Sequence, residues 1–370
     1  MRILEVCVDL DGGGIDRYLL NYCSRIDGIQ FDFAIIDKEK KGILEEPILA
    51  LGSNIYKIPR QKSGLIRNYK ALKKIITENN YQAVHIHLGA KSLIALLCAY
   101  RCGVKARIVH AHIAFVPETR KERIIRKILT VPVKILATSL TACGEDAARW
   151  VWGNRAFERK KVTVHNNAIQ LSKFRFSAVE RQRLRQELGI KGKSLVFGHV
   201  GRLCDQKNQL RLLDIFAEII KRVPDACLLL IGRGEMEKEV SEKIQKMQLS
   251  DQQVKMLGIR DDVNLLLNAM DAFVFPSKYE GLPFTLIETQ GNGLPAVSSD
   301  IVTPQVKLTD CLSFLPLNST DETWAERAIQ IASEGHDENA WEKVQAAGYD
   351  IDVEAKKLEA FYLACIEGKR

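Results

Sequence analysis

Residues 271–288 read Asp-Ala-Phe-Val-Phe-Pro-Ser-Lys-Tyr-Glu-Gly-Leu-Pro-Phe-Thr-Leu-Ile-Glu, and the fold assignment starts from them. The apolar run at 271–275 predicts a buried strand, and Gly281 and Pro283 shape the loop that follows it. A strand that passes through such a loop into a helix is typical of βαβ units, whose strands are parallel.

Two acids, Glu280 and Glu288, flank the predicted start of this helix, which we expect at Phe284 or Thr285. Glu288 then lies about one turn inside the helix, on the face that looks back toward the loop. A pair of carboxylates suits the hydroxyl groups of a sugar and a ribose, because each carboxylate can accept two hydrogen bonds. The alternative is that an acid near a helix N-terminus only stabilises the helix.

Short apolar runs alternate with longer amphipathic stretches along the rest of the chain. Strands are predicted at 2–8, 31–36, 83–87, 106–110, 135–142, 194–200, 226–231, 253–257 and 295–298. Helices are predicted at 15–26, 65–79, 91–102, 207–222, 235–246, 285–292 and 321–334, with basic helical sequence at about 171–192. This alternation predicts an α/β protein made of two Rossmann-like lobes with parallel sheets.

The predicted domains follow from this pattern and from the length of 370 residues, which is sufficient for two hydrophobic cores. Residues 1–188 form the first lobe and residues 189–350 form the second. The C-terminal helix, 351–370, is expected to return to the first lobe.

Composition and targeting signals point to a globular protein of the cytoplasm. The chain is 46% hydrophobic and 27% charged, and no apolar run approaches the roughly 20 residues that span a bilayer. The N-terminal segment resembles a first strand and lacks the cleavage site of a signal peptide. Nine cysteines spread along the chain favour reduced thiols, and no second Cys/His pair gives Cys98 and Cys102 a metal-binding spacing.

The net charge differs strongly between the two halves. Residues 1–185 contain 33 Lys and Arg against 17 Asp and Glu, whereas residues 186–370 contain 21 against 29, so the halves carry +16 and −8. A basic first half favours an anionic lipid, a phosphorylated acceptor or a nucleic acid as partner, and a merely solvated surface stays open. We expect no nucleic-acid partner, because no recognised module or aromatic stacking pattern is present.

Three consecutive glycines, Gly12, Gly13 and Gly14, follow the first predicted strand. They allow unusual backbone angles and let main-chain amides at a helix start approach an anion or a sugar. Residues 15 and 17 are Ile and Arg, so the dinucleotide-binding spacing is absent. A simple tight turn stays an equal alternative.

Two cations, Arg202 and Lys207, lie five residues apart in the loop that follows the strand at 194–200. Cations beside a helix N-terminus can bind a pyrophosphate through fixed charge, oriented amides and the helix dipole. Considered alone, two exposed loop cations would be the more common explanation.

The order of these motifs resembles that of the family-4 retaining glycosyltransferases of GT-B fold. The resemblance rests on five ordered features across about 100 residues. They are Gly201-Arg202, Lys207-Asn208, Gly232-x-Gly234-Glu235, Leu257-Gly258 and the E-x7-E pair Glu280 and Glu288. Bacterial exopolysaccharide and capsule transferases are the most similar in character. A GT-B fold implies that the two sheets face each other across a cleft.

The resemblance implies roles for the second lobe. Arg202 and Lys207 would hold the diphosphate of the donor, and Glu288 would bind the ribose hydroxyls. Glu280 would contact the transferred sugar and stabilise the positively charged transition state. The remaining donor-binding residues would be those of the loop between the two acids: Gly281, Leu282, Pro283, Phe284 and Thr285. The family more often has Gly followed by an aliphatic residue at Pro283-Phe284, which leaves the identity of the donor sugar open.

The resemblance covers the first lobe only through its glycine turn and the strand end His110-Ala111-His112. It implies that His112 faces the sugar as a catalytic residue, with His110 as the alternative. A histidine at a strand end can also be purely structural.

The resemblance also implies an activity: a hexosyltransferase that moves a sugar from a nucleotide sugar, with UDP as the first choice. The acceptor would be lipid-diphosphate-linked or a saccharide, in polysaccharide biosynthesis. No metal or other cofactor is expected, on the interpretation that the chain has no Asp-x-Asp motif to hold a divalent ion. The charge of Arg202 and Lys207 can stabilise the leaving nucleotide instead. A nucleotide-sugar 2-epimerase and a non-catalytic GT-B partner protein are the alternatives.

A basic amphipathic helix is expected at 120–129. Ile124, Ile125, Ile128 and Leu129 form its apolar stripe, with cations over the remaining surface. Such a helix could rest on an anionic membrane surface, which would make the protein peripheral at the inner face of the cell membrane. Equally, the stripe could pack on the sheet.

Overall fold

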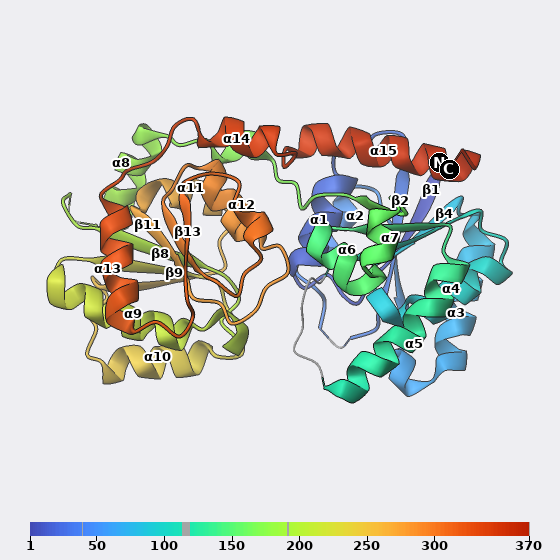
Figure 1. The fold of residues 1–370 in the computed structure, drawn as a ribbon, viewed down its shortest axis with the longest axis horizontal. Coiled ribbons are helices and arrows are strands. Elements are labelled where there is room, and N and C mark those ends of the chain that lie inside the picture. The colour runs from blue at the N-terminus through green and yellow to red at the C-terminus, as the bar shows by residue number, and fades with distance from the viewer. Residues whose placement is uncertain (39, 113–118, 191, 370) are drawn as a thin grey trace. The chain divides into compact units, whose positions relative to one another are not determined.

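The computed structural model describes residues 1–38, 40–112, 119–190 and 192–369. The chain forms two compact units, each with its own core. The first unit consists of Met1–Ala168 and Ile351–Arg370, and the second of Ile169–Asp350. Each is a parallel sheet covered by helices, so the α/β class and the two Rossmann-like units are confirmed (Figure 1).

The first unit contains a seven-stranded sheet of order β3-β2-β1-β4-β5-β6-β7, with every pairing parallel. This is the arrangement of a doubly wound fold, in which ligands bind beyond the carboxyl ends of the strands. The strands are β1 (Arg2–Val6), β2 (Gln30–Ile36), β3 (Ile55–Ile58), β4 (Ala83–Ile86), β5 (Ala106–Ala111), β6 (Ser139–Ala142) and β7 (Val162–Val164). The helices are α1 (Gly14–Cys23), α2 (Glu45–Ala50), α3 (Leu65–Asn79), α4 (Leu93–Arg101), α5 (Arg120–Leu136), α6 (Glu145–Trp152), α7 (Asn154–Glu158) and α15 (Ile351–Glu367).

The two faces of this sheet differ in polarity. Alternate residues of a strand point to opposite faces. One face is apolar and packs on α3, α4 and α6, with Leu4, Val84 and Val109 in its core. The other face carries Glu5 and four histidines from β4 and β5 and their carboxyl ends, with Tyr18 of α1 and Tyr362 of α15 against them. The fold therefore buries a polar cluster under two helices.

The second unit contains a six-stranded parallel sheet of order β10-β9-β8-β11-β12-β13. Its strands are β8 (Val196–Val200), β9 (Cys227–Ile231), β10 (Val254–Gly258), β11 (Ala272–Phe275), β12 (Ala296–Ser299) and β13 (Leu312–Leu315). Its helices are α8 (Ala178–Glu187), α9 (Gln209–Arg222), α10 (Glu237–Lys246), α11 (Val263–Ala269), α12 (Phe284–Gly291), α13 (Asp321–Ala332) and α14 (Ala340–Ala346). β8 and β11 are neighbours, so the loops that follow them share one edge of the sheet.

The boundary between the units differs from the predicted one. The chain enters the second unit at residue 169, not at 189, because α8 packs on α11 of the second unit. Arg181 and Arg185 of α8 both bind the carboxylate of Asp271, which precedes β11. Residues 351–370 lie in the first unit.

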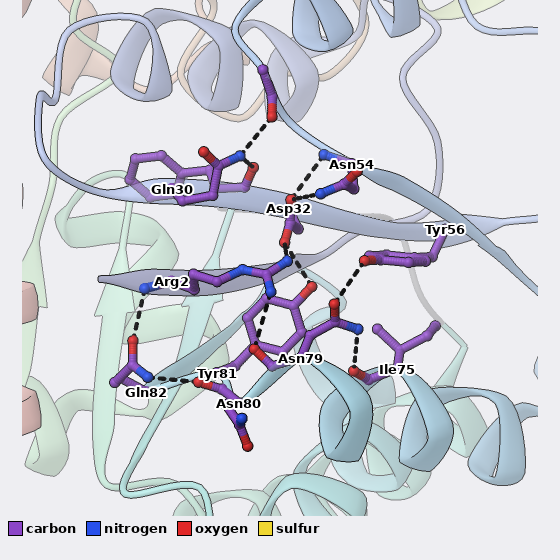
Figure 2. A network of polar contacts seen from close by, with 12 residues as sticks. Arg2, Gln30, Asp32, Asn54, Tyr56, Ile75, Asn79, Asn80, Tyr81 and Gln82 are labelled. Carbon is purple, nitrogen blue, oxygen red and sulfur yellow. Dashed lines mark hydrogen bonds and ion pairs between the residues drawn. The ribbon is translucent and has the colours of Figure 1, made fainter.

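A polar network closes the amino-terminal edge of the first sheet (Figure 2). The guanidinium group of Arg2 lies 2.5 Å from the Asp32 carboxylate, to which Tyr81 donates a hydrogen bond of 2.8 Å. Asn54 donates to the same carboxylate through its backbone and side-chain nitrogens, at 2.8 Å and 2.9 Å. Burial opposes ionisation of Asp32, but these bonds lower its pKa. The network joins the starts of β1 and β2 to the loops before β3 and β4.

One predicted strand, 135–142, is partly helical. α5 continues to Leu136, and β6 occupies only Ser139–Ala142. The helix begins with a capping box in which Thr119 and Glu122 satisfy each other's backbone amides.

Among the described residues, no helix is both long and apolar enough to cross a membrane.

Candidate functional site

An ion pair joins the two loops that share the carboxyl edge of β8 and β11. The Nζ atom of Lys207 lies 2.6 Å from Oε1 of Glu280 and 4.7 Å from the centre of the Phe275 ring. The side chains of Lys207 and Glu280 are only 15% and 7% exposed. The structure therefore brings together two residues that were predicted to contact different parts of one ligand.

The local backbone explains why these side chains meet. Asn208 adopts a left-handed conformation with φ of 61° between the short 3-10 turn Asp205–Lys207 and α9. Its side-chain amide donates to the carbonyl of Pro276 at 3.1 Å, and Gln206 donates to the carbonyl of Tyr279 at 2.8 Å. These bonds fasten the β8 loop to the β11 loop, so Lys207 is held against Glu280.

Arg202 occupies a different environment from Lys207. Its side chain is 71% exposed, and its Nε atom lies 2.9 Å from the carboxylate of Glu235, which is exposed as well. Exposed ion pairs of this kind contribute little to stability, because water screens them. Arg202 is thus accessible for a ligand, and its ion pair is separate from that of Lys207 with Glu280.

The glycine turn at 232–234 packs directly on the backbone that follows β8. A Cβ atom on Gly232, whose φ is +131°, would lie 2.1 Å from the carbonyl oxygen of Gly201. A Cβ on Gly234 would lie 2.1 Å from the carbonyl oxygen of Leu203. Both glycines are therefore required for the close approach of two backbones on either side of Arg202.

The loop between the two acids leads into α12, which begins at Phe284, as predicted. Leu282 and Phe284 are buried, whereas Gly281 and Thr285 are partly exposed. Glu288 lies in the second turn of α12 and is 5% exposed. The structure places both acids in one strand–loop–helix unit, with Glu280 on the loop and Glu288 inside the helix.

In the first unit, the glycine turn differs from the predicted anion-binding loop. Gly12 has φ of +88°, Gly13 precedes α1 and Gly14 is its first residue. The amides of Gly12 and Gly13 both donate to Oδ2 of Asp16, at 3.0 Å each. The expectation that these amides are available to an anion or a sugar is wrong for Gly12 and Gly13, because the chain's own carboxylate occupies them.

Asp16 is itself an unusual acid. Burial and the nearby Asp9 carboxylate raise its pKa to about 7, and the two glycine amides offset only part of this effect. The side chain therefore changes charge near neutral pH, directly beside the glycine turn.

His112 follows β5 and lies at the rim of the buried polar cluster. Its Nε2 atom is 2.7 Å from Nδ1 of His87, and its ring stacks on that of His110 at a centroid distance of 4.2 Å. His110 is fully buried, whereas His112 is partly exposed. Of the two histidines considered from the sequence, His112 is the one that a ligand can reach.

The rest of the cluster was not identified from the sequence. Nε2 of His87 lies 2.7 Å from Oε2 of Glu5, and the hydroxyl of Tyr362 donates to Oε1 of Glu5 at 3.1 Å. Burial would raise the pKa of Glu5, but His85 and His87 overcome this and lower it to about 2. Burial and His85 lower the pKa of His87 to about 4, although Glu5 acts in the opposite direction. The signal for the cluster was the period of two in His85-Ile86-His87 and His110-Ala111-His112, which places each pair on one face.

The histidine cluster also bears on metal binding. His85, His87 and His110 each offer a ring nitrogen, and these atoms lie within 4.8 Å of one another. This group could hold a transition metal, but both ring nitrogens of His87 already lie at hydrogen-bonding distance from Glu5 and His112. A metal ion at His87 would have to displace one of them.

The sequence prediction of no metal also overlooked two Asp-x-Asp sequences elsewhere in the chain, Asp9-Leu10-Asp11 and Asp350-Ile351-Asp352. In the first, Lys38 neutralises both acids, with Nζ 2.7 Å and 2.6 Å from their carboxylates. In the second, Gln345 donates a hydrogen bond to Asp350 and Arg25 pairs with Asp352. Both motifs are therefore engaged by side chains of the chain itself.

Comparison with known proteins gives consistent matches. Residues 180–344 match the family model described as "Glycosyl transferases group 1". EpsF of Bacillus subtilis (strain 168), whose name places it with the glycosyltransferases, is 30% identical over 358 residues, or 94% of this chain and 93% of that protein. The "UDP-Gal:alpha-D-GlcNAc-diphosphoundecaprenol alpha-1,3-galactosyltransferase" of Escherichia coli is 30% identical over 303 residues, covering 78% and 76%.

Solved structures agree on the fold. Anabaena Alr3699/HepE in complex with UDP superposes with a TM-score of 0.79 at 18% identity, over 98% of this chain and 100% of that one. A sucrose-phosphate synthase from Thermosynechococcus elongatus superposes with a TM-score of 0.75 at 18% identity, over the whole of both chains.

Proposed function

Since this chain belongs to the group 1 glycosyltransferases, we propose that it transfers a hexose from a nucleotide sugar, with retention of anomeric configuration. The observation that carries the proposal is the contact between Lys207 and Glu280 at the carboxyl edge of β8 and β11. A cation and an acid on adjoining loops match the two parts of a nucleotide-sugar donor, its diphosphate and its sugar. UDP is the proposed nucleotide, because the Escherichia coli relative is named for a UDP-sugar and HepE was solved with UDP.

The proposed acceptor is a saccharide carried on a lipid diphosphate, in polysaccharide biosynthesis. The name of the Escherichia coli relative specifies a diphosphoundecaprenol acceptor, and another relative is a capsular polysaccharide biosynthesis glycosyltransferase from Staphylococcus aureus. The surplus of cations in residues 1–185 is complementary to such a diphosphate.

Each residue of the donor site has a proposed role. Lys207, together with Arg202, neutralises the diphosphate as the bond to the sugar lengthens. Glu280 then exchanges its contact with Lys207 for hydroxyls of the sugar, and its negative charge stabilises the oxocarbenium-like transition state. Glu288 binds the ribose. His112 contacts a hydroxyl of the transferred sugar.

We also propose that transfer requires no divalent metal ion. Two cations and the amides at the start of α12 can carry the charge that a metal would otherwise neutralise. To test whether an Asp-x-Asp sequence nevertheless holds a metal ion, Asp9 and Asp11 are the residues to replace. They form the only such sequence that follows the end of a described strand.

The test measures nucleotide release and donor binding separately. We expect UDP to raise the melting temperature, since a ligand at 100 times its Kd adds about 2.7 kcal/mol of stability. We expect UDP release from one of a panel of UDP-hexoses once a lipid-diphosphate saccharide is added, and the same rate in excess EDTA. The metal-free proposal would be contradicted if EDTA abolished the activity of the wild type and Mg²⁺ or Mn²⁺ restored it. Failure of the metal to restore activity in an Asp9→Asn, Asp11→Asn variant would then place the metal at these two acids.

The same assay separates the alternatives. A nucleotide-sugar 2-epimerase would change the sugar without needing an acceptor. A non-catalytic GT-B protein would bind the donor and release no nucleotide. Both outcomes would leave the family assignment intact and remove the proposed reaction.

A second proposal concerns the surface of the first unit. On α5, Ile124, Ile128, Val131 and Ile135 are 50%, 64%, 58% and 76% exposed. Their spacing of four, three and four residues puts them on one side of the helix. Of the predicted stripe, Ile124, Ile125 and Ile128 are exposed and Leu129 is partly exposed. The alternative that the stripe packs on the sheet is therefore wrong for the three isoleucines, and the buried side of α5 includes Thr130 and Val133.

We propose that this side of α5 rests on an anionic membrane. Exposed cations, among them Arg123 and Lys127, flank the apolar stripe, and each adds about 1 kcal/mol of attraction near such a surface. Arg126 acts differently, because its guanidinium donates to the carbonyl of Trp150 and stacks on that ring at 3.8 Å. Arg126 therefore belongs to the packing of α5 on α6 and should not be changed in a binding test.

Vesicle co-sedimentation tests the membrane proposal. We expect binding to vesicles that contain anionic lipid, weakened at least about tenfold by Arg123→Gln with Lys127→Gln. Ile128→Ser with Ile135→Ser should weaken it independently of salt. A matched control is Val179→Ser on α8, which removes an equally exposed apolar side chain from the second unit. Binding that ignores lipid charge and all these changes would leave a soluble acceptor as the better explanation.

A further inference from the structure

We infer that Glu5 and His87 are positioning residues that determine which ring nitrogen of His112 carries its proton. The inference deepens the proposed function, because it concerns the histidine proposed to contact the sugar. It rests on a continuous chain of three side chains from β1, β4 and the end of β5.

Two short contacts link the three side chains, and Glu5 and His87 are buried. Oε2 of Glu5 lies 2.7 Å from Nε2 of His87, and Nδ1 of His87 lies 2.7 Å from Nε2 of His112. Glu5 is 1% exposed and His87 is 3% exposed. Both contacts are short enough to require one hydrogen between each pair of atoms.

The position of each hydrogen follows from the state of Glu5. An ionised carboxylate can only accept hydrogen bonds, so Nε2 of His87 must carry the hydrogen. His87 stays neutral, because burial and His85 keep its pKa near 4, and its Nδ1 is therefore an acceptor. Nε2 of His112 must then donate to it. Burial and His87 likewise hold the pKa of His112 well below its usual value, so its Nδ1 carries a lone pair.

The surrounding groups support this state. Tyr362 donates its hydroxyl to the second oxygen of Glu5 at 3.1 Å, and His85 lies 2.7 Å from the same hydroxyl. His110 stacks on His112, and Tyr18 contacts both rings edge-on. The chain of contacts starts at the carboxylate of Glu5, and Nδ1 of His85 lies 3.4 Å from its Oε2.

The position of this hydrogen determines which hydrogen bond His112 can make with a ligand. His112 offers a hydrogen-bond acceptor to its ligand at Nδ1, as a sugar hydroxyl requires, and does not act as a proton donor. Residues that fix the tautomer of a functional histidine from behind commonly change activity by about 10–100-fold when they are replaced.

The primary test reads the tautomers directly and needs no activity. In full-length protein labelled with ¹⁵N-histidine, long-range ¹H–¹⁵N spectra distinguish protonated from unprotonated ring nitrogens. We expect both His87 and His112 to be neutral with the hydrogen on Nε2 between pH 6 and pH 8. A hydrogen on Nδ1 of either ring, a charged ring, or ring signals that change on addition of EDTA would overturn the inference.

Variants then test the cause. Glu5→Leu should leave a mixture of tautomers at His112, whereas Glu5→Gln should retain the wild-type state because its amide oxygen still accepts from His87. His87→Phe removes the acceptor for His112 and should have the same effect as Glu5→Leu. Tyr22→Phe is the matched control, since it removes a buried hydrogen bond of 2.7 Å to Asn166 without touching the chain.

Kinetics connect the tautomer to turnover. We expect Glu5→Leu to lower kcat by about 10–100-fold and Glu5→Gln to restore most of it, with UDP affinity unchanged in both. Normal kcat in Glu5→Leu with a mixed tautomer would overturn the functional part of the inference. If the wild type transfers no sugar at all, the proposed function fails, and the spectra still decide on the positions of the hydrogens.

Discussion

The carboxyl edges of the two sheets carry opposite kinds of electrostatics on the same type of scaffold. In the second unit, a lysine and a glutamate with formal charges meet at 2.6 Å on two loops and stay partly accessible. In the first unit, His87 and His110, whose pKa values burial lowers, lie near the carboxylate of Glu5, whose contact with His87 is almost completely enclosed. Both units have a parallel sheet with a carboxyl edge, but the residues at the strand ends differ, and these residues determine which ligands each edge can bind.

The difference has a physical meaning for ligands. A partly buried ion pair can exchange one partner for a ligand of the same charge, because the ligand restores the opposite charge beside the remaining residue. A buried cluster with one fixed charge cannot exchange partners, but it holds its hydrogens in a fixed order. The second unit is thus suited to charged phosphates, and the first to neutral hydroxyl groups.

The largest expected effect is a loss of kcat when Glu280, the acid at the carboxyl edge of the second sheet, is replaced. We expect Glu280→Gln to lower kcat by about 100-fold or more, because it removes a charge aimed at the transition state. The donor KM should not rise, since Lys207 loses a competitor for the phosphates. Glu288→Gln is the matched comparison and should mainly raise the donor KM. Steady-state kinetics with the reverse partition would show that the roles of the two acids are wrongly assigned.

A smaller effect separates the two cations. We expect Lys207→Met to weaken UDP binding by about 1.5–3 kcal/mol, which is the usual cost of a hydrogen bond to a charged group. Arg202→Met should cost less, because its side chain is 71% exposed and screened by water. Lys278→Met serves as the control, since Lys278 pairs with the exposed Asp205. Calorimetry that finds unchanged affinity in Lys207→Met would remove the donor site from this edge.

The smallest expected effect concerns stability, and it lies at Asp16 of the first unit. The pKa of Asp16 is raised from an ordinary 3.8 to about 7, so folding strengthens its hold on a proton. Its contribution to the free energy of unfolding is fully present below about pH 4 and is lost as the pH rises through 7. Asp16→Asn should remove this dependence. The measurement is urea unfolding of both proteins from pH 5 to pH 8, and parallel stability curves would contradict the shifted pKa.

The sequence predicted the fold well where periodicity was strong. The helix at 65–79 has the predicted bounds, the C-terminal helix begins at the predicted residue 351, and ten predicted strands correspond to strands of the two sheets. The strands β3, β7 and β13, which have three or four residues each, were not predicted. The boundary was misplaced because the contacts of Arg181 and Arg185 with Asp271 link segments far apart in the chain.

The site was predictable only where a motif was local. Glu280, Glu288 and Lys207 were chosen from their spacing along the chain. Glu5, His87 and Tyr362 were not, since their relation depends on the register of β1 with β4 and on the return of α15. The prediction for the Gly12 and Gly13 amides was wrong for a different reason. The sequence contains Asp16 nearby, but it does not predict that the Asp16 side chain turns back and accepts hydrogen bonds from both amides.

The route of the chain sets an order for its biogenesis. The second unit is one continuous segment, whereas the first also needs α15 (Figure 1). The hydroxyl of Tyr362 on α15 donates to Glu5, and Sγ of Cys365 lies 3.2 Å from Oγ of Ser139. A ribosome therefore delivers every residue of the second unit before it delivers the last helix of the first. Until α15 is made, the polar face of the first sheet lacks Tyr362, so a nascent chain that stalls at residue 350 would leave Glu5 without the hydroxyl that donates to it.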